Sequence, residues 1–117
     1  MPRDNSHPYL LPMKLWLDDM RDPVDHGHTD AVWVKTAEEA IEILRTGKVR
    51  FISFDHDLGT VLDGNDVAGE IEKLVYEGEI KLPLWKVHSA NPVGSREITQ
   101  TMESAARLAM LHRPFDH

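Results

Sequence analysis

Four short apolar runs alternate with helical patterns along this chain. The runs occupy residues 14–17, 31–34, 51–54 and 84–87, and the second and third are rich in β-branched and aromatic side chains, which favour strands. Apolar residues repeat at helical spacing within residues 37–44, 67–75 and 98–109. This alternation predicts a parallel sheet with right-handed crossovers and helices on both faces, hence a three-layer α/β domain.

The sequence also marks several element boundaries. Thr36 and Glu39 form a capping box at the first helical pattern, and the third pattern is expected to begin near Ser95. The connection at residues 21–30 contains proline and glycine, which predicts a loop or a degraded helix. Lys86 interrupts the fourth apolar run. Because a buried lysine is costly, we expect the fourth strand at an edge, in the strand order 2-1-3-4.

Composition restricts the class of protein. The chain has 117 residues, a formal net charge of −7 and no cysteine. The missing cysteines exclude disulfides, a cysteine nucleophile and thiolate metal sites, and the acidic balance argues against binding a nucleic-acid polymer. No apolar run approaches the ~20 residues that span a bilayer, so we expect a cytoplasmic protein without a membrane partner. We expect one domain at residues 13–112, an irregular segment at 1–12 and a tail at 113–117.

Three of the four predicted strands end in polar clusters. In open α/β sheets, ligands bind beyond the carboxyl ends of the strands, at the point where the strand order reverses. In the expected order, that point lies between the first and third strands. The clusters after the first, third and fourth strands are Asp18-Asp19, Asp55-His56-Asp57 and His88-Ser89.

The carboxylates in these clusters predict a metal site. Carboxylates gathered at one sheet edge repel, and each raises the pKa of its neighbours. A hard divalent cation removes the repulsion, and oxygen ligands without thiolates suit Mg²⁺ or Mn²⁺. We expect Asp18, Asp19 and Asp55 to hold the cation, with Asp57 close by as a further ligand through its backbone carbonyl. The alternative is that these aspartates are only turn residues or helix caps.

The segment from His88 to Arg96 combines a strand end, a Pro/Gly turn and a helix start. Free backbone amides at a helix N-terminus favour anions. Ser89, Asn91 and Arg96 are therefore candidates to bind a phosphate. The alternative is an ordinary connection in which Asn91 or Ser95 caps the helix.

The histidines fall into two groups. His56 and His88 follow strands, and a side chain that titrates near neutral pH suits a proton donor. His26 and His28 lie in the predicted loop, where we expect them to be solvated.

These motifs resemble those of response-regulator receiver domains, and more closely those of a divergent branch, the cyclic-phosphate-processing receiver-like family. The resemblance covers nearly all of residues 13–110 and implies a receiver-like (flavodoxin-like) fold. A full receiver has a fifth strand that ends in a phosphate-pairing lysine. This sequence shows no fifth strand after Met110 and no lysine after Lys86, which argues against ordinary receiver signalling. The matching segments are LWLDDMR at 15–21, TAEEA at 36–40, ISFDHDLG at 52–59 and HSANPVG at 88–94.

The resemblance implies metal-dependent processing of a cyclic phosphate on a small, nucleotide-derived substrate, which makes the chain a phosphoesterase-type hydrolase. His88 or His56 would protonate the leaving oxygen. Asp55 would be either a metal ligand or a nucleophile that forms an aspartyl-phosphate, and the sequence leaves both routes open. A second hypothesis is a signalling or nucleotide-binding module without turnover, in which Asp55 accepts a phosphate. A third is a structural domain whose acidic residues only hold Mg²⁺.

Overall fold

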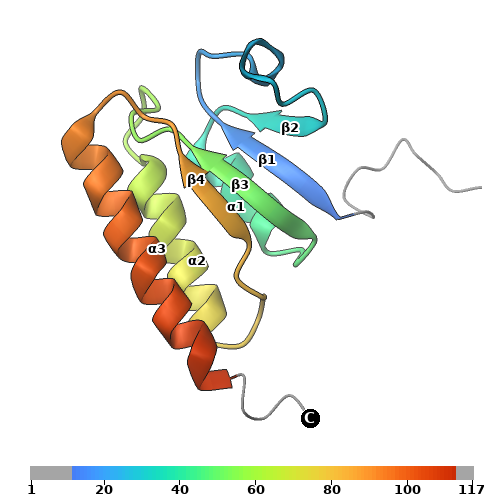
Figure 1. Ribbon diagram of the computed structural model, residues 1–117, viewed down its shortest axis with the longest axis vertical. Helices are drawn as coiled ribbons and strands as arrows, with labels where there is room; N and C mark the ends of the chain where they lie inside the picture. Colours follow the sequence, from blue (N-terminus) through green and yellow to red (C-terminus); the bar gives the residue numbers. More distant parts are fainter. Residues whose placement is uncertain (1–11, 113–117) are drawn as a thin grey trace, which may run out of the picture.

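The computed structural model describes residues 12–112 as a single α/β domain (Figure 1). Residues 1–11 and 113–117, which the sequence assigns to irregular ends, lie outside the described residues. The sheet is wholly parallel, in the predicted order β2-β1-β3-β4. Its strands are β1 (Met13–Leu17), β2 (Ala31–Val34), β3 (Val49–Phe54) and β4 (Leu84–Val87).

Three α-helices follow the last three strands: α1 (Ala37–Leu44), α2 (Gly64–Tyr76) and α3 (Pro92–His112). The first begins at the predicted capping box, where the Thr36 hydroxyl accepts a hydrogen bond from the Glu39 amide at 3.2 Å. The third begins at Pro92 instead of near Ser95. A proline suits the first turn of a helix, because its missing N–H has no partner there in any case.

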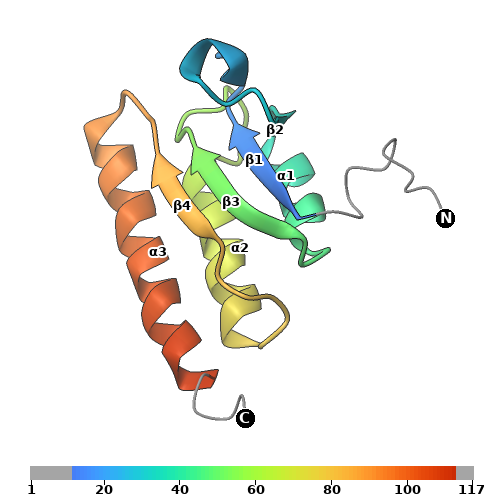
Figure 2. The same ribbon diagram turned by 45° about the vertical axis from the view of Figure 1, so that its right-hand side comes forward.

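All three α-helices lie on one face of the sheet. The side chains of Leu15, Leu17, Ile52 and Phe54 point to this face and are fully buried. The helix α2 packs against both α1 and α3, which places the three helices in one layer. Figure 2 shows α1 and α2 behind the sheet and α3 alongside α2.

This two-layer arrangement differs from the expected three layers, and handedness explains the difference. The connections from β2 to β3 and from β3 to β4 cross the sheet in one direction, so right-handed crossovers place their helices on one face. The connection from β1 to β2 runs in the opposite direction and belongs to the other face. It contains only the 3-10 helix η2 (Pro23–His26), which confirms the degraded helix predicted there. Within residues 12–112, no α-helix covers that second face.

The edges of the sheet agree with the sequence. Strand β4 is an edge strand and Lys86 is exposed on it, as predicted. Among the described residues, no fifth strand follows β4. None of the described helices combines the length and the apolar character that crossing a membrane requires.

The two-layer fold predicts that two alanine substitutions on neighbouring strands change the free energy of unfolding by very different amounts. Ile52→Ala should lower the free energy of unfolding by about 2–5 kcal/mol, because it leaves a cavity under α2. Lys86→Ala should change it by less than ~0.5 kcal/mol, because this side chain is exposed at an edge. Urea unfolding followed by circular dichroism measures both values. Similar losses in the two variants would contradict the assignment of the buried face.

Candidate functional site

The carboxyl ends of the strands bring three acidic side chains together. Strands β1 and β3 end in register at Leu17 and Phe54, and their arrowheads point to the same edge of the sheet (Figure 2). The Asp55 amide continues the ladder by donating to the Leu17 carbonyl at 2.8 Å. One carboxylate oxygen from each of Asp18, Asp19 and Asp55 lies within 4.8 Å of the others. Within residues 12–112, this is the one group of acidic and histidine side chains with metal-ligand spacing.

Asp18 is the most buried member of this carboxylate cluster, with 1% of its surface exposed. Its Oδ1 accepts hydrogen bonds from the Met20 and Arg21 amides at 2.8 and 2.9 Å, and its Oδ2 lies 3.0 Å from His88 Nε2. Burial alone would raise the pKa of Asp18, but these hydrogen bonds lower it below its usual value. The Asp18 carbonyl also accepts a hydrogen bond from Trp33 Nε1 at 2.7 Å. Asp18 is therefore ionised and held in place from both sides.

The pKa of Asp55 shifts in the opposite direction to that of Asp18. Burial and the neighbouring charge of Asp18 raise its pKa above the usual value. The His56 amide, which donates to Asp55 Oδ1 at 2.8 Å, and the Ser89 hydroxyl oppose this shift without cancelling it. A divalent cation between the two carboxylates would remove the repulsion, so the residues present fit a Mg²⁺ or Mn²⁺ site.

Two glycines let the loop between β3 and α2 close over the cluster. Gly59 has a φ of 70°, which strongly favours glycine, and a Cβ there would lie 3.2 Å from Asp19 Oδ2. A Cβ on Gly64 would overlap the backbone carbonyl of Asp55. The start of α2 therefore rests directly on Asp55, and the loop rests on Asp19.

His88 is held by hydrogen bonds on both ring nitrogens. Its Nε2 lies 3.0 Å from Asp18 Oδ2 and its Nδ1 lies 2.7 Å from the buried Ser53 hydroxyl. Burial lowers the pKa of His88, and the contact with Asp18 only partly opposes this shift. A neutral ring then donates from Nε2 to Asp18 and accepts at Nδ1 from Ser53.

Aromatic rings cover His88 on the second face of the sheet. Trp16 stacks on it with a centroid separation of 3.9 Å and an interplanar angle of 3°. His26 and His28, both expected to be solvated, contact the Trp16 ring, with centroids 5.4 and 5.1 Å from it. His26 remains exposed and His28 is partly buried. No α-helix of the described residues covers this face of the sheet. The histidines of the η2 connection therefore cover Trp16 in its place.

His56 lies in a separate cluster of acidic side chains. Its Nδ1 is 2.9 Å from Asp57, and its Nε2 is 3.2 Å from Glu97 and 3.3 Å from Asp63. Burial opposes the charged ring, but the hydrogen bond to Asp57 and the nearby carboxylates raise its pKa. A Cβ on Gly94 would overlap the ring, so His56 packs directly against the backbone of α3. The ring therefore joins the β3–α2 loop to the first turns of α3.

Asp57, an expected further ligand, does not join the carboxylate cluster through its side chain, because both carboxylate oxygens have other partners. One oxygen contacts His56, and the other accepts a hydrogen bond from Asn91 Nδ2 at 3.3 Å. Asn91 Oδ1 accepts from the Gly94 amide at 3.0 Å and caps α3. This is the capping alternative for Asn91, whose side chain is already engaged in these two bonds.

The other two phosphate-binding candidates occupy different environments. Ser89 lies beside the carboxylate cluster, where its hydroxyl lowers the pKa of Asp55. The same hydroxyl accepts a hydrogen bond from the Asn91 amide at 3.0 Å. Arg96 is exposed in the first turns of α3.

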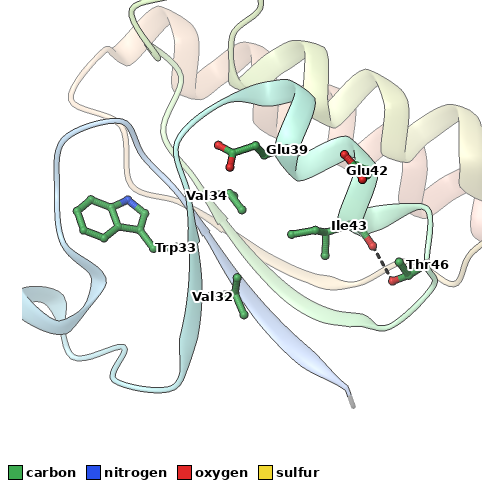
Figure 3. A pocket seen from close by; sticks show the side chains of 7 residues that line it. All are labelled: Val32, Trp33, Val34, Glu39, Glu42, Ile43 and Thr46. Carbon is green, nitrogen blue, oxygen red and sulfur yellow. Dashed lines mark hydrogen bonds between the residues drawn. The ribbon is translucent and has the colours of Figure 1, made fainter. Parts of the chain in front are cut away.

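A hollow of about 240 Å³ lies elsewhere, between the free edge of β2 and α1 (Figure 3). Its lining is apolar, apart from Thr46, Glu39 and Glu42. Glu39 accepts a hydrogen bond from the hydroxyl of Thr36, the N-cap of α1, and Thr46 donates to the Ile43 carbonyl. None of the polar residues that follow β1, β3 and β4 lines this hollow. The candidate chemistry therefore belongs to the carboxylate cluster.

The fold and the strand-end carboxylates define a receiver-like α/β domain. A family described as the cyclic-phosphate processing receiver domain matches residues 13–104, from the first residue of β1 into α3. The chain therefore belongs to this family. Comparison with curated proteins and with solved structures gives no significant match.

The carboxylate cluster predicts that divalent cations stabilise the fold. Millimolar Mg²⁺ or Mn²⁺ should raise the melting temperature, because a cation that binds only the folded cluster shifts the equilibrium by mass action. Asp19→Asn should reduce this increase, whereas Asp25→Asn, which removes an exposed carboxylate from η2, should preserve it. Differential scanning fluorimetry with and without EDTA measures the increase. An unchanged melting temperature with both cations would exclude the metal site.

Proposed function

We propose that this chain is a divalent-cation-dependent phosphoesterase that opens a cyclic phosphate on a small, nucleotide-derived substrate. The convergence of Asp18, Asp19 and Asp55 is the observation that carries the proposal. Two of these carboxylates are buried, and burial together with the charge of Asp18, which a cation would offset, raises the pKa of Asp55. The family description supports a cyclic phosphate as the substrate class.

The roles of the acidic residues follow from their contacts. When bound, a divalent cation neutralises the carboxylates and polarises a phosphoryl oxygen. Asp18 is oriented for binding it by two backbone amides and His88. Asp55 is oriented by the His56 amide, and Asp19 is the more exposed third ligand. Ser89 lies beside Asp55, where its hydroxyl suits a contact with the phosphate of the substrate.

The two histidines take different roles in this proposal. His88 is the candidate proton donor nearer to the reaction, because it contacts a carboxylate of the cluster directly. To act as the acid, its ring must first take up a proton at Nδ1, against the effect of burial on its pKa. The same contact makes His88 a positioning residue for Asp18. His56 is bonded to Asp57 and Glu97 and positions the loop that carries Asp55. Asn91 fixes the start of α3, and Arg96 remains a candidate contact for the phosphate.

A phosphate-accepting module is the second candidate function. The Ser89 hydroxyl beside Asp55 favours it, because receivers place a serine or threonine at this position. The same geometry suits an aspartyl-phosphate intermediate in hydrolysis. Incubation with acetyl phosphate and Mg²⁺, followed by intact-mass measurement, separates a stable phosphorylated Asp55 from turnover.

The proposed activity predicts cation-dependent opening of at least one cyclic phosphate. The screen offers 2′,3′-cyclic nucleotides, 3′,5′-cyclic nucleotides, ADP-ribose 1″,2″-cyclic phosphate and cyclic dinucleotides, each with Mg²⁺, Mn²⁺ or EDTA. Chromatography should detect a phosphomonoester product with either cation and none with EDTA. Asp55→Asn should lose both cation affinity and rate, because it removes a charged ligand from the cluster. The absence of product from every class of substrate would contradict the proposal.

Substitution of the histidines separates their roles. His88→Ala should lower kcat by about 10²-fold or more, the usual contribution of a positioned acid. It should also weaken the response to Mg²⁺, because Asp18 loses a hydrogen-bond donor. His56→Ala should cause a smaller loss of rate and leave the Mg²⁺ response in place. If His56→Ala abolishes turnover while His88→Ala stays active, the two roles must be exchanged.

A further inference from the structure

Arg21 is anchored at the carboxylate cluster by its backbone. Its amide donates to Asp18 Oδ1 at 2.9 Å, and its carbonyl accepts a hydrogen bond from Trp16 Nε1 at 2.8 Å. Trp16 is itself almost fully buried, in contact with the His88 ring. These two backbone hydrogen bonds fix the Cα of Arg21 beside the cluster. They do not depend on the side chain at this position.

The guanidinium of Arg21 is not fixed in the same way. Its nearest carboxylate oxygen is Asp18 Oδ2, at 3.7 Å, which is longer than a hydrogen bond. The side chain is 42% exposed, and among residues 12–112 the guanidinium makes no hydrogen bond. Arginine usually pairs with carboxylates through two short parallel bonds. The donors of Arg21 are therefore available to a ligand.

The charge of Arg21 reaches the groups around the candidate site. It opposes the rise in the pKa of Asp55 and contributes to the lowered pKa of His88. Three carboxylates and a divalent cation together leave one negative charge, which the guanidinium offsets before an anionic phosphodiester arrives. The positive charge thus lies beside the carboxylates that would hold the cation, where it favours an anionic ligand.

We propose that Arg21 binds a non-bridging oxygen of the substrate phosphate and stabilises the negative charge that grows on it during the reaction. This inference rests on the proposed hydrolysis. In that step the oxygen of water forms a bond to phosphorus, and the bond from phosphorus to one ring oxygen breaks. The leaving oxygen takes up a proton, and the product is a phosphomonoester. Arg21 gives up no proton, because a guanidinium stays protonated; it donates hydrogen bonds to the phosphoryl oxygens.

The first test measures binding of inorganic phosphate to the full chain in Mg²⁺ by isothermal titration calorimetry. Arg21→Gln should weaken binding by about 10- to 100-fold, because it removes charge-assisted hydrogen bonds to the anion. Arg21→Lys should recover part of the loss, since lysine keeps the charge without the planar pair of donors. Arg50→Gln is the matched control, because Arg50 is exposed at the opposite end of β3.

The backbone contacts make the Arg21 variants interpretable. Every substitution keeps the amide that donates to Asp18, so Arg21→Gln should retain the increase in melting temperature that Mg²⁺ causes. A variant that loses this increase has lost the cation site, and the inference is then wrong. The inference is also wrong if wild-type protein binds no phosphate, if Arg21→Gln binds it as tightly as wild type, or if Arg96→Gln alone causes the loss.

Turnover distinguishes this inference from the proposed hydrolysis. If phosphate binding requires Arg21 but no cyclic phosphate is opened, the assignment of Arg21 stands and the hydrolysis fails. If 2′,3′-cyclic AMP is opened and Arg21→Gln keeps the wild-type kcat/KM, the hydrolysis stands and the assignment of Arg21 fails.

Discussion

Repulsion between the carboxylates of Asp18 and Asp55 is the interaction on which the rest of this site depends. The parallel pairing of β1 and β3 places both groups at one edge of the sheet, and burial strengthens their interaction. Asp18 is kept ionised by two backbone amides and His88, whereas burial and the charge of Asp18 raise the pKa of Asp55. A divalent cation bound between the two carboxylates would convert this repulsion into binding energy.

The handedness of the crossovers determines what surrounds the cluster. The three α-helices of the described residues cover one face, so within residues 12–112 the short η2 connection and side chains cover the second face. There Trp16 stacks on His88, which donates to Asp18, and Trp16 Nε1 also holds the backbone of Arg21. The packing of this face and the orientation of the candidate metal ligands are therefore coupled.

Much of this structure could be predicted from the sequence, because the decisive patterns are local. Apolar runs and helical spacing predict the strands, their order and the edge position of Lys86, and parallel pairing then brings Asp18 and Asp55 together. The layer count was wrong, since the pattern does not show whether a weak connection forms an α-helix. The contacts of Trp16 with His88 and His28 join separate segments through side-chain orientation, which spacing does not encode. Gly59 offered a usable clue, because a glycine just after a strand-end cluster often permits a close approach of the backbone.

The central claim is that Asp18, Asp19 and Asp55 together hold one divalent cation. The most direct test is a crystal structure of the protein soaked in Mn²⁺, with diffraction data recorded for the anomalous signal of manganese. We expect one strong anomalous peak among these carboxylates, with an oxygen of each carboxylate at about 2.0–2.2 Å from the manganese ion. A peak beside the separate acidic cluster of Asp57, Asp63 and Glu97, or no peak at the strand ends, would contradict it.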